Sequence, residues 1–407
     1  MKGILESSAS YRALGTIIVI KSYSIGNGAV GTAQKSPFRS TSVHLRSDHC
    51  YLSAPINVFK AGSAYISKMK ACVIGADGAL EISEQPKPEI TRGELLVKMR
   101  ACGICGTDVE KLHGNYPSKI LGHEAVGEIV SVGDGVRDFE PGDRVFPHHH
   151  VPCYDCHFCR NGSETMCPHF SRSNIHPGGL AEYFTVPEWN VSRSAVFKLP
   201  EQMSFRAGAL IEPLACVLRG LGKAPLGTDS HVAVIGVGPV GMLHVAALKI
   251  LGAKHIAAVD LSGERREFAR KLGADETFSP QEAVGGIVES SGGIGSDLTI
   301  VAAGSPPAIS TGIETLRKGG KLIQFGLPKP GMRLESDFSA IFRKEISIIT
   351  TYSGIERDVA DAISMIALHA GKFESMISHS FRLDEAGEAF KLAEDVNAAR
   401  KIIVESG

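Results

Sequence analysis

The chain has 407 residues, of which 43% are hydrophobic and 21% charged, and its formal net charge is −1. This length allows two globular domains, each with its own core. The balanced charge gives no electrostatic reason to expect nucleic acid or an anionic membrane as a partner. No apolar run reaches the roughly 18 residues of a membrane-spanning helix, which favours a soluble protein.

Residues 1–68 differ in composition from the rest of the chain. They are rich in serine and carry eight Lys or Arg residues against only Glu6 and Asp48. An organellar transit peptide has this composition. A mis-assigned start, with translation beginning at Met69, is the favoured explanation because no amphipathic helix precedes that residue. We therefore expect residues 1–68 to be an extension outside the fold and the protein to be cytoplasmic.

Residues 69 to about 200 contain short strands separated by Gly and Pro turns. In GELLVKMRAC and GEIVSVGDGV, apolar and polar residues alternate. Alternation with this period is typical of half-buried antiparallel strands. The segment is predicted to form a β-rich, barrel-like domain.

From about residue 230 the pattern changes to buried strands separated by helical stretches. Five apolar runs, HVAVIG, HIAAVD, SDLTIVAAG, KLIQFG and ISIITTYSG, are rich in β-branched residues. Such runs are typical of a parallel sheet, and the alternation with helices indicates an α/β fold. The C-terminal stretch predicts a helix over DVADAISMIALHAG, a helix over DEAGEAFKLAED and a strand over ARKIIVE.

A glycine-rich turn follows the first of these parallel strands. Gly236 is suited to the tight turn, Gly238 to close approach of the backbone to a pyrophosphate, and Gly241 to close helix–strand packing. The helix that follows would present its positive end to the pyrophosphate. This context, with HIAAVD ending in an acid, predicts a dinucleotide site formed by Gly236, Gly238, Val240, Gly241, Asp260 and Arg265.

The acid at the end of the second strand bears on cofactor choice. Asp260 lies 19 residues beyond Gly241, at the position expected to accept hydrogen bonds from the ribose hydroxyls. A carboxylate there repels a 2′-phosphate, so NAD is expected over NADP. Arg265 and Arg266 lie nearby and keep NADP open as the alternative.

Four of the nine cysteines fall within fifteen residues. Four thiolates at this spacing can close a tetrahedral zinc shell with no open position, which is the composition of a structural site. An iron–sulfur cluster is the alternative, since it also uses four cysteines. The predicted structural zinc ligands are Cys153, Cys156, Cys159 and Cys167.

A second ligand set is dispersed along the chain. A thiolate, an imidazole and one carboxylate would neutralise Zn²⁺ and leave a fourth position for an alcohol, as in catalytic zinc sites. Spacing alone does not link its carboxylate to the other residues. The candidate residues are Cys105, His123, Glu124 and Glu212.

Several motifs in order resemble the zinc-containing medium-chain dehydrogenase/reductase family, over about residues 69 to 407. Gly122-His123-Glu124 is followed by glycines at 127 and 133 and by Val136, then by Gly142-Asp143-Arg144-Val145, the four cysteines and the glycine-rich turn. The resemblance implies a GroES-like catalytic domain over 69–215, completed by 355–407. It also implies a Rossmann domain over 216–354.

The resemblance also implies roles for the dispersed residues. Cys105 and His123 are implied zinc ligands, and Glu124 is an adjacent carboxylate that coordinates at some stage. Glu212 with Pro213 is similar to the sorbitol dehydrogenase branch, where liver-type alcohol dehydrogenases carry a cysteine. Thr107 matches the residue that accepts the substrate proton, and Asp108 matches an orienter of His123.

The expected activity is therefore zinc-dependent and NAD-dependent oxidation of a small secondary alcohol or polyol. Zinc would bind the alcohol oxygen and lower its pKa, and hydride would pass to the nicotinamide. Two zinc ions per chain and a homodimer or homotetramer are expected. Threonine 3-dehydrogenase, which shares Cys105-Gly-Thr107-Asp108, is one alternative. A catalytically silent NAD- and zinc-binding sensor or structural protein is the other.

Three features depart from the family pattern. Glu110 stands where many relatives carry a proton-relay histidine, for which His113 or direct contact with solvent could substitute. Thr351 falls where sorbitol dehydrogenases carry a substrate-contacting arginine, which weakens the polyol assignment. The run at residues 148–150, three histidines, is expected to be a solvated loop at the mouth of the cleft rather than a third metal site.

Overall fold

A computed structural model describes residues 67–114, 118–227, 229–334, 336–395 and 399–406. The predicted extension lies outside the described residues except for its last two. The chain divides into Met1–Ser63 and Ala64–Gly407, and only the second unit is considered below. Among the described residues, no helix has both the length and the apolar character needed to cross a membrane.

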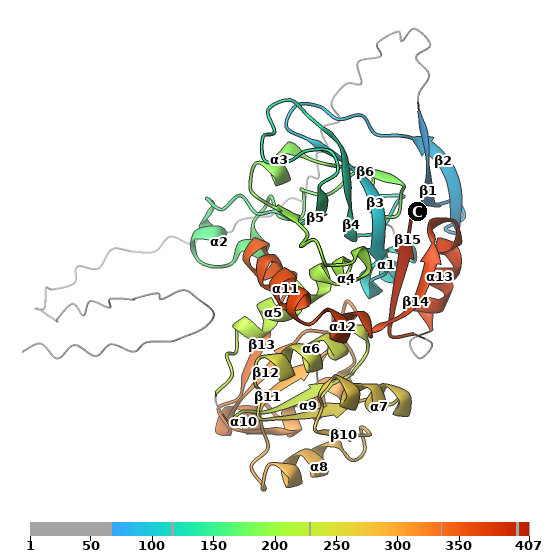
Figure 1. The fold of residues 1–407 in the computed structure, drawn as a ribbon. Coiled ribbons are helices and arrows are strands. Elements are labelled where there is room, and N and C mark those ends of the chain that lie inside the picture. The colour runs from blue at the N-terminus through green and yellow to red at the C-terminus, as the bar shows by residue number, and fades with distance from the viewer. Residues whose placement is uncertain (1–66, 115–117, 228, 335, 396–398, 407) are drawn as a thin grey trace, which may run out of the picture. The chain divides into compact units, whose positions relative to one another are not determined.

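A seven-stranded sheet forms the first part of this unit (Figure 1). The strands run in the order β14-β15-β3-β4-β5-β7, with β6 also paired to β3. All pairs are antiparallel except β14 with β15, so the predicted antiparallel organisation is confirmed. The strands are β3 (Leu95–Gly103), β4 (Glu124–Val132), β5 (Arg144–Pro147), β6 (Tyr183–Val186), β7 (Val196–Lys198), β14 (Ile377–Arg382) and β15 (Lys401–Glu405).

Period-two alternation explains how this sheet acquires a core. Leu95, Val97 and Met99 of β3 are fully buried in one apolar cluster. A separate antiparallel pair, β1 (Lys68–Ile74) and β2 (Leu80–Pro86), packs on the same cluster. Short helices connect the strands: α1 (Gly106–Leu112), α2 (His157–Arg160), η1 (Glu164–Met166), α3 (Glu188–Val191), α4 (Phe205–Gly208), and the longer α5 (Ile211–Gly222).

A six-stranded parallel sheet forms the second part, in the order β10-β9-β8-β11-β12-β13. This is the order of a doubly wound dinucleotide-binding fold, with its switch point between β8 and β11. The strands are β8 (His231–Ile235), β9 (His255–Val259), β10 (Glu276–Phe278), β11 (Ser296–Val301), β12 (Leu316–Gln324) and β13 (Ser347–Thr350). Five of them were predicted; β10 was missed because three residues are too few to give a periodic signal.

Helices cover both faces of the parallel sheet. In β8, Val232 and Val234 belong to one apolar cluster, whereas Ala233 and Ile235 belong to another on the opposite face. Successive side chains of a strand point to opposite faces, so a strand buried on both sides must be apolar throughout. The helices are α6 (Pro239–Ile250), α7 (Gly263–Leu272), α8 (Ala283–Ser290), α9 (Pro306–Glu314) and α10 (Phe338–Arg343).

The C-terminal segment returns to the first sheet. Both predicted helices and the last strand are present, as α11 (Glu356–Leu368), α13 (Ala386–Glu394) and β15. The intervening α12 (Ala370–Glu374), β14 and η2 (Leu383–Glu385) were missed. Helix α11 packs along α5 (Figure 1). We keep the division 69–215 with 355–407, and 216–354, as a proposal; its first boundary falls inside α5.

Candidate metal and dinucleotide site

Strand pairing brings residues distant in sequence to one place. Gly103 at the end of β3 lies opposite Glu124 at the start of β4, and Ile403 of β15 lies opposite Gly103 on the other side. A Cβ atom at Gly103 would lie 1.8 Å from Oε2 of Glu124, so glycine is required for this close approach. Cys105 follows β3 by two residues and His123 directly precedes β4, so both reach the same end of the sheet.

Three candidate ligands form a compact cluster. One donor atom from each of Cys105, His123 and Glu124 lies within 4.8 Å of the others. The hydroxyl of Thr107 donates to Sγ of Cys105 at 3.0 Å. A thiolate, an imidazole and a carboxylate at this separation fit a zinc ion with an open position.

Asp108 orients this cluster. Its Oδ1 lies 3.1 Å from Nδ1 of His123, and its Oδ2 accepts a hydrogen bond from the backbone N–H of Cys105 at 3.1 Å. This contact leaves Nε2 of His123 for a metal ion. Burial lowers the pKa of His123, but the Asp108 and Cys105 charges outweigh it and hold that pKa well above its usual value. The cluster thus favours a positive charge at this point.

Lys401, the first residue of β15, is a site residue that the sequence did not reveal. Its side chain is 5% exposed, and its ammonium donates to Oε2 of Glu124 and, at 3.0 Å, to the carbonyl of Ile104. Burial lowers the pKa of Lys401, but the Glu124 carboxylate raises it above its usual value. In the sequence, a lysine at the start of a strand looks like an ordinary solvated strand end.

Glu212 lies in the first turn of α5, outside the three-residue cluster. It is 7% exposed, and its Oε1 accepts a hydrogen bond from the thiol of Cys216 at 3.3 Å. It is still close enough for its charge to act on Glu124 and Lys401. The structure therefore puts Glu212 beside the cluster rather than within it.

The residues at which the chain departs from the family pattern lie on different segments, one on α1 and one directly after β13. Glu110 is exposed on α1. His113 is also exposed, and its Nε2 lies 2.8 Å from Oε1 of Glu394. Thr351 packs against α5, where a Cβ atom on Gly220 would lie 3.3 Å from its Cγ2.

The prediction of a solvated loop at residues 148–150 is wrong. His148 is 0% exposed and His149 is 4% exposed. The ring of His149 lies 5.1 Å from that of His123, and Nδ1 of His148 lies 3.0 Å from Oε1 of Glu356. Polarity suggested solvent, but aromatic neighbours and a carboxylate from α11 bury these rings. His150 contacts Phe170.

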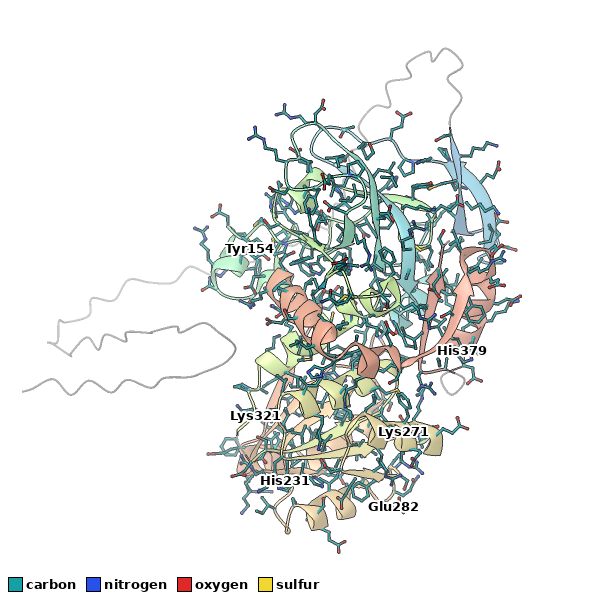
Figure 2. All side chains as sticks on the ribbon, viewed as in Figure 1. Tyr154, His231, Lys271, Glu282, Lys321 and His379 are labelled. Carbon is teal, nitrogen blue, oxygen red and sulfur yellow. The ribbon has the colours of Figure 1, made fainter. Side chains whose placement is uncertain are left out.

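The four cysteines converge in a separate lobe that contains α2 and η1. Their sulfurs lie within 4.8 Å of one another, and the hydrogen-bonded pairs are 3.5 to 4.0 Å apart. A Zn–S bond of about 2.3 Å gives a tetrahedral edge of about 3.8 Å, so the donor set fits zinc. The backbone N–H groups of Asp155 and Cys156 lower the pKa of the Cys153 thiol to about 7, which favours a thiolate. Tyr154 lies in the same lobe (Figure 2).

The glycine-rich turn has the expected geometry. Gly236 has a φ of 88°, and a Cβ atom at Gly241 would lie 2.0 Å from the carbonyl oxygen of Gly236. Gly238 caps the N-terminus of α6. Asp260 accepts hydrogen bonds from the backbone N–H groups of Val237 at 2.8 Å and Ser262 at 2.9 Å.

One cavity is lined both by residues of the Cys105, His123 and Glu124 cluster and by residues of the glycine-rich turn. The two predicted sites therefore open into the same space. Its lining includes Cys105, Glu124, Lys401, Gly238, Val240, Gly241 and Arg265. An anionic dinucleotide phosphate would meet the positive end of α6 there, and a reacting group beyond it would meet Cys105 and Glu124.

Comparisons with known proteins agree with this geometry. Residues 91–200 match the alcohol dehydrogenase GroES-like domain, and residues 239–367 match the zinc-binding dehydrogenase model. The chain is 33% identical over 335 residues to the sorbitol dehydrogenase of Gallus gallus, which covers 79% of this chain and 92% of that protein. It is 31% identical over 339 residues to the D-xylulose reductase A of Aspergillus niger, with 79% and 92% covered.

A solved structure extends the comparison. A zinc-binding dehydrogenase from Sinorhizobium meliloti 1021, bound to NADP, matches with a TM-score of 0.73 and 31% identity, over 83% of this chain and 99% of that one. Fold and site thus define an oxidoreductase that uses zinc and a nicotinamide dinucleotide. The chain belongs to the zinc-containing medium-chain dehydrogenase/reductase family. The predicted GroES-like and Rossmann folds are confirmed.

Proposed function

We propose that the protein oxidises a small polyol or secondary alcohol to the ketone or aldehyde, with NAD as the hydride acceptor. The observation that carries this proposal is a cavity whose wall includes both Cys105 and residues of the glycine-rich turn. The names of the relatives, a sorbitol dehydrogenase and a D-xylulose reductase, support a polyol as the substrate class. Spectrophotometric detection of NADH with a panel of polyols and secondary alcohols tests it.

The residues at this site have different proposed roles, metal binding for some and orientation of a metal ligand for another. A zinc ion bound here would supply a Lewis acid that makes an alcohol proton easier to lose, and a bound NAD would supply the hydride acceptor. We propose Cys105, His123 and Glu124 as the nearer ligands, with Glu212 able to join them by turning from Cys216. Asp108 fixes the ring of His123.

Thr107 is proposed to accept the substrate proton. Its hydroxyl lies 3.0 Å from Sγ of Cys105, one of the three candidate metal ligands. A hydroxyl can accept one proton while it donates its own, so it can pass a proton on without holding a charge. His113 is tied to Glu394 on the surface, so the proposal does not assign it this proton.

Metal content gives a direct test of the two ligand sets. Because one set is closed and the other is open, we expect about two zinc ions per chain. Cys156→Ser should lose one of them and lower the melting temperature before it changes turnover. Elemental analysis by mass spectrometry counts the zinc ions, and thermal unfolding with steady-state kinetics measures the melting temperature and the turnover. Iron with visible charge-transfer absorption would contradict the structural-zinc assignment.

We propose that NAD is preferred over NADP and that Asp260 sets the preference. Each of its carboxylate oxygens accepts one backbone N–H and retains a lone pair for a ribose hydroxyl. A 2′-phosphate there would face a like charge at a cost of about 2 kcal/mol, or about thirtyfold in kcat/KM. Asp260→Ser should lose most of this ratio.

The neighbouring arginines, Arg265 and Arg266, would favour NADP, because a cation attracts the 2′-phosphate that Asp260 repels. Nη1 of Arg266 donates to the backbone carbonyl of Asp260 at 2.6 Å, so a cation already lies beside this loop. If the ratio of kcat/KM with NAD to kcat/KM with NADP is unchanged in Asp260→Ser, Asp260 does not set the cofactor preference. An unmodified enzyme that prefers NADP would contradict the cofactor proposal itself.

We also propose that the protein is a homo-oligomer. Strand β13 is an edge of the parallel sheet, and near it Phe338 and Phe342 are 74% and 76% exposed. Large exposed apolar side chains beside an open strand edge favour association. Light scattering should give a dimer or tetramer, and Phe342→Lys should shift it towards the monomer. A monomeric unmodified protein would contradict this. The cytoplasmic location stays a prediction.

A further inference from the structure

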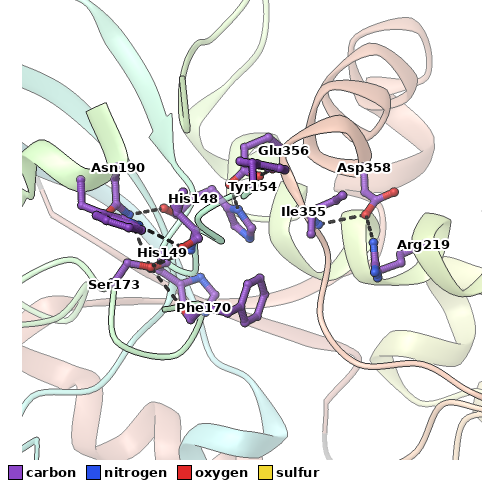
Figure 3. Close-up of polar contacts among 12 residues, drawn as sticks. His148, His149, Tyr154, Phe170, Ser173, Asn190, Arg219, Ile355, Glu356 and Asp358 are labelled. Carbon is purple, nitrogen blue, oxygen red and sulfur yellow. Dashed lines mark hydrogen bonds and ion pairs between the residues drawn. The ribbon is translucent and has the colours of Figure 1, made fainter. Parts of the chain in front are cut away.

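The four-cysteine lobe is connected to the candidate catalytic cluster through one carboxylate. Glu356 is the first residue of α11, and both of its oxygens are engaged. Oε1 lies 3.0 Å from Nδ1 of His148, and Oε2 accepts a hydrogen bond from the hydroxyl of Tyr154 (Figure 3). Tyr154 lies between Cys153 and Cys156, so its position follows the conformation of the lobe.

His148, the partner of Glu356, is connected through His149 to the candidate catalytic cluster of Cys105, His123 and Glu124. His148 is 0% exposed, and its carbonyl accepts a hydrogen bond from Nδ2 of Asn190 at 2.8 Å (Figure 3). The next residue, His149, has its ring 5.1 Å from the ring of His123. The rings of His148 and His149 pack edge to face with centroids 5.6 Å apart, so a residue that fixes His148 also supports the ring that packs on His123.

A second connection runs from the lobe to α5. Glu164, in η1 of the lobe, lies 3.2 Å from Nη2 of Arg219, and Asp358 of α11 lies 3.5 Å from Nη1 of the same guanidinium. Arg219 is 6% exposed. Residues 212, 216 and 219 lie on one face of α5, because their spacing is that of successive helical turns. The lobe is thus linked through Arg219 to both α5, which carries Glu212, and α11.

The apolar contacts of the same region are consistent with this arrangement. Ile355, directly before α11, is 2% exposed and packs with Cys167 and Phe170. Its backbone N–H donates to Asp358 at 2.9 Å, which closes the first turn of the helix. The start of α11 is therefore seated on the lobe by apolar, ionic and hydrogen-bonded contacts.

We propose that Glu356 is a positioning residue that couples the four-cysteine lobe to the catalytic cluster, by holding His148 and Tyr154 at once. Its loss lets the His149 ring move from His123, which changes how that imidazole is presented to a metal ion. The lobe then acts on turnover as well as on folding. This inference rests on the proposed function only for its kinetic readout.

The test uses two variants with matched controls. Glu356→Gln removes the charge and keeps the shape, and Tyr154→Phe removes one hydroxyl from a residue that is 44% exposed. Asp361→Asn, an exposed acid on the same helix, and Tyr352→Phe, a tyrosine that is 53% exposed, are the controls. Since Tyr154 is exposed at the surface, its variant is expected to fold.

We expect Glu356→Gln to lower kcat by about tenfold, the lower end of the effect for partners of metal ligands. Tyr154→Phe removes only one of the two contacts of Glu356, so we expect a smaller loss of about threefold, below that range. The KM for NAD should change by less than about twofold, because the glycine-rich turn is not touched. With cobalt(II) in the catalytic site, the visible thiolate absorption should shift in both variants and in neither control.

Two outcomes overturn the proposal. The first is cobalt spectra of both variants that superimpose on that of the unmodified protein. The second is a kcat within about twofold for both variants, because a purely structural link would lower stability alone. If the unmodified protein oxidises no alcohol, the proposed function fails, and the cobalt spectra still decide whether Glu356 couples the two sites.

Discussion

His123→Ala and Cys105→Ser are expected to lower kcat/KM for the alcohol by at least about a thousandfold. The Lewis-acid effect of a metal ion is worth several kcal/mol, and each 1.4 kcal/mol or so is a factor of about ten in rate. These two residues supply the thiolate and the imidazole of the cluster, which stand within 4.8 Å of each other and of Glu124. Steady-state kinetics with zinc-loaded protein measures the effect.

The same variants should still bind the cofactor. The glycine-rich turn lies between β8 and α6, on a different sheet from Cys105 and His123. The Kd for NADH, measured by fluorescence titration, should therefore stay within about threefold, less than 1 kcal/mol. His379→Ala, an exposed histidine on β14, is the matched control and should keep full turnover. Unmodified turnover in either His123→Ala or Cys105→Ser would remove that residue from the metal site.

Lys401→Met should destabilise the fold by about 3–5 kcal/mol, the usual cost of removing one partner of a buried ion pair. Glu124 is 1% exposed and Lys401 is 5% exposed, so the remaining carboxylate would be buried without its cation. The methionine has a similar length, so the loss reflects charge more than volume. Urea unfolding of chelator-treated protein measures it as a lower midpoint.

A double variant separates charge from packing. Adding Glu124→Gln to Lys401→Met removes the unpaired charge, and it should restore a large part of the lost stability. Lys391→Met, at an exposed lysine of α13, is the control and should have little effect. A loss below about 1 kcal/mol in Lys401→Met would mean that Glu124 is not held as a charged group by this lysine.

Local patterns account for the parts of the fold that the sequence predicted. The glycine-rich turn and the four cysteines each lie within fifteen residues, so a ligand could be proposed for each without knowing the fold, and both assignments stay predictions. The apolar runs of the parallel sheet are equally local. Short or polar elements were missed: β10 has three residues, and β14 reads ISHSFR, with exposed residues at half of its positions.

Non-local contacts account for what was missed. Lys401 and Glu124 are 277 residues apart and meet only because β15 and β4 both flank β3. Polarity misled the interpretation of residues 148–150, because Glu356 and Asn190 come from distant elements to bind the Nδ1 atom and the carbonyl of the buried His148. The contact of Glu212 with Cys216 is local to α5, whereas the distance of Glu212 from the three-residue cluster depends on how α5 packs.

The central claim is tested most directly by following NADH formation by zinc-loaded protein with sorbitol, xylitol, butane-2,3-diol, a simple secondary alcohol and threonine. The account predicts reduction of NAD with at least one polyol or secondary alcohol, and loss of that activity when a chelator removes the metal. Threonine as the preferred substrate would contradict the assigned substrate class. No NADH with any of these compounds, from protein that has about two zinc ions bound per chain, would contradict the proposed function.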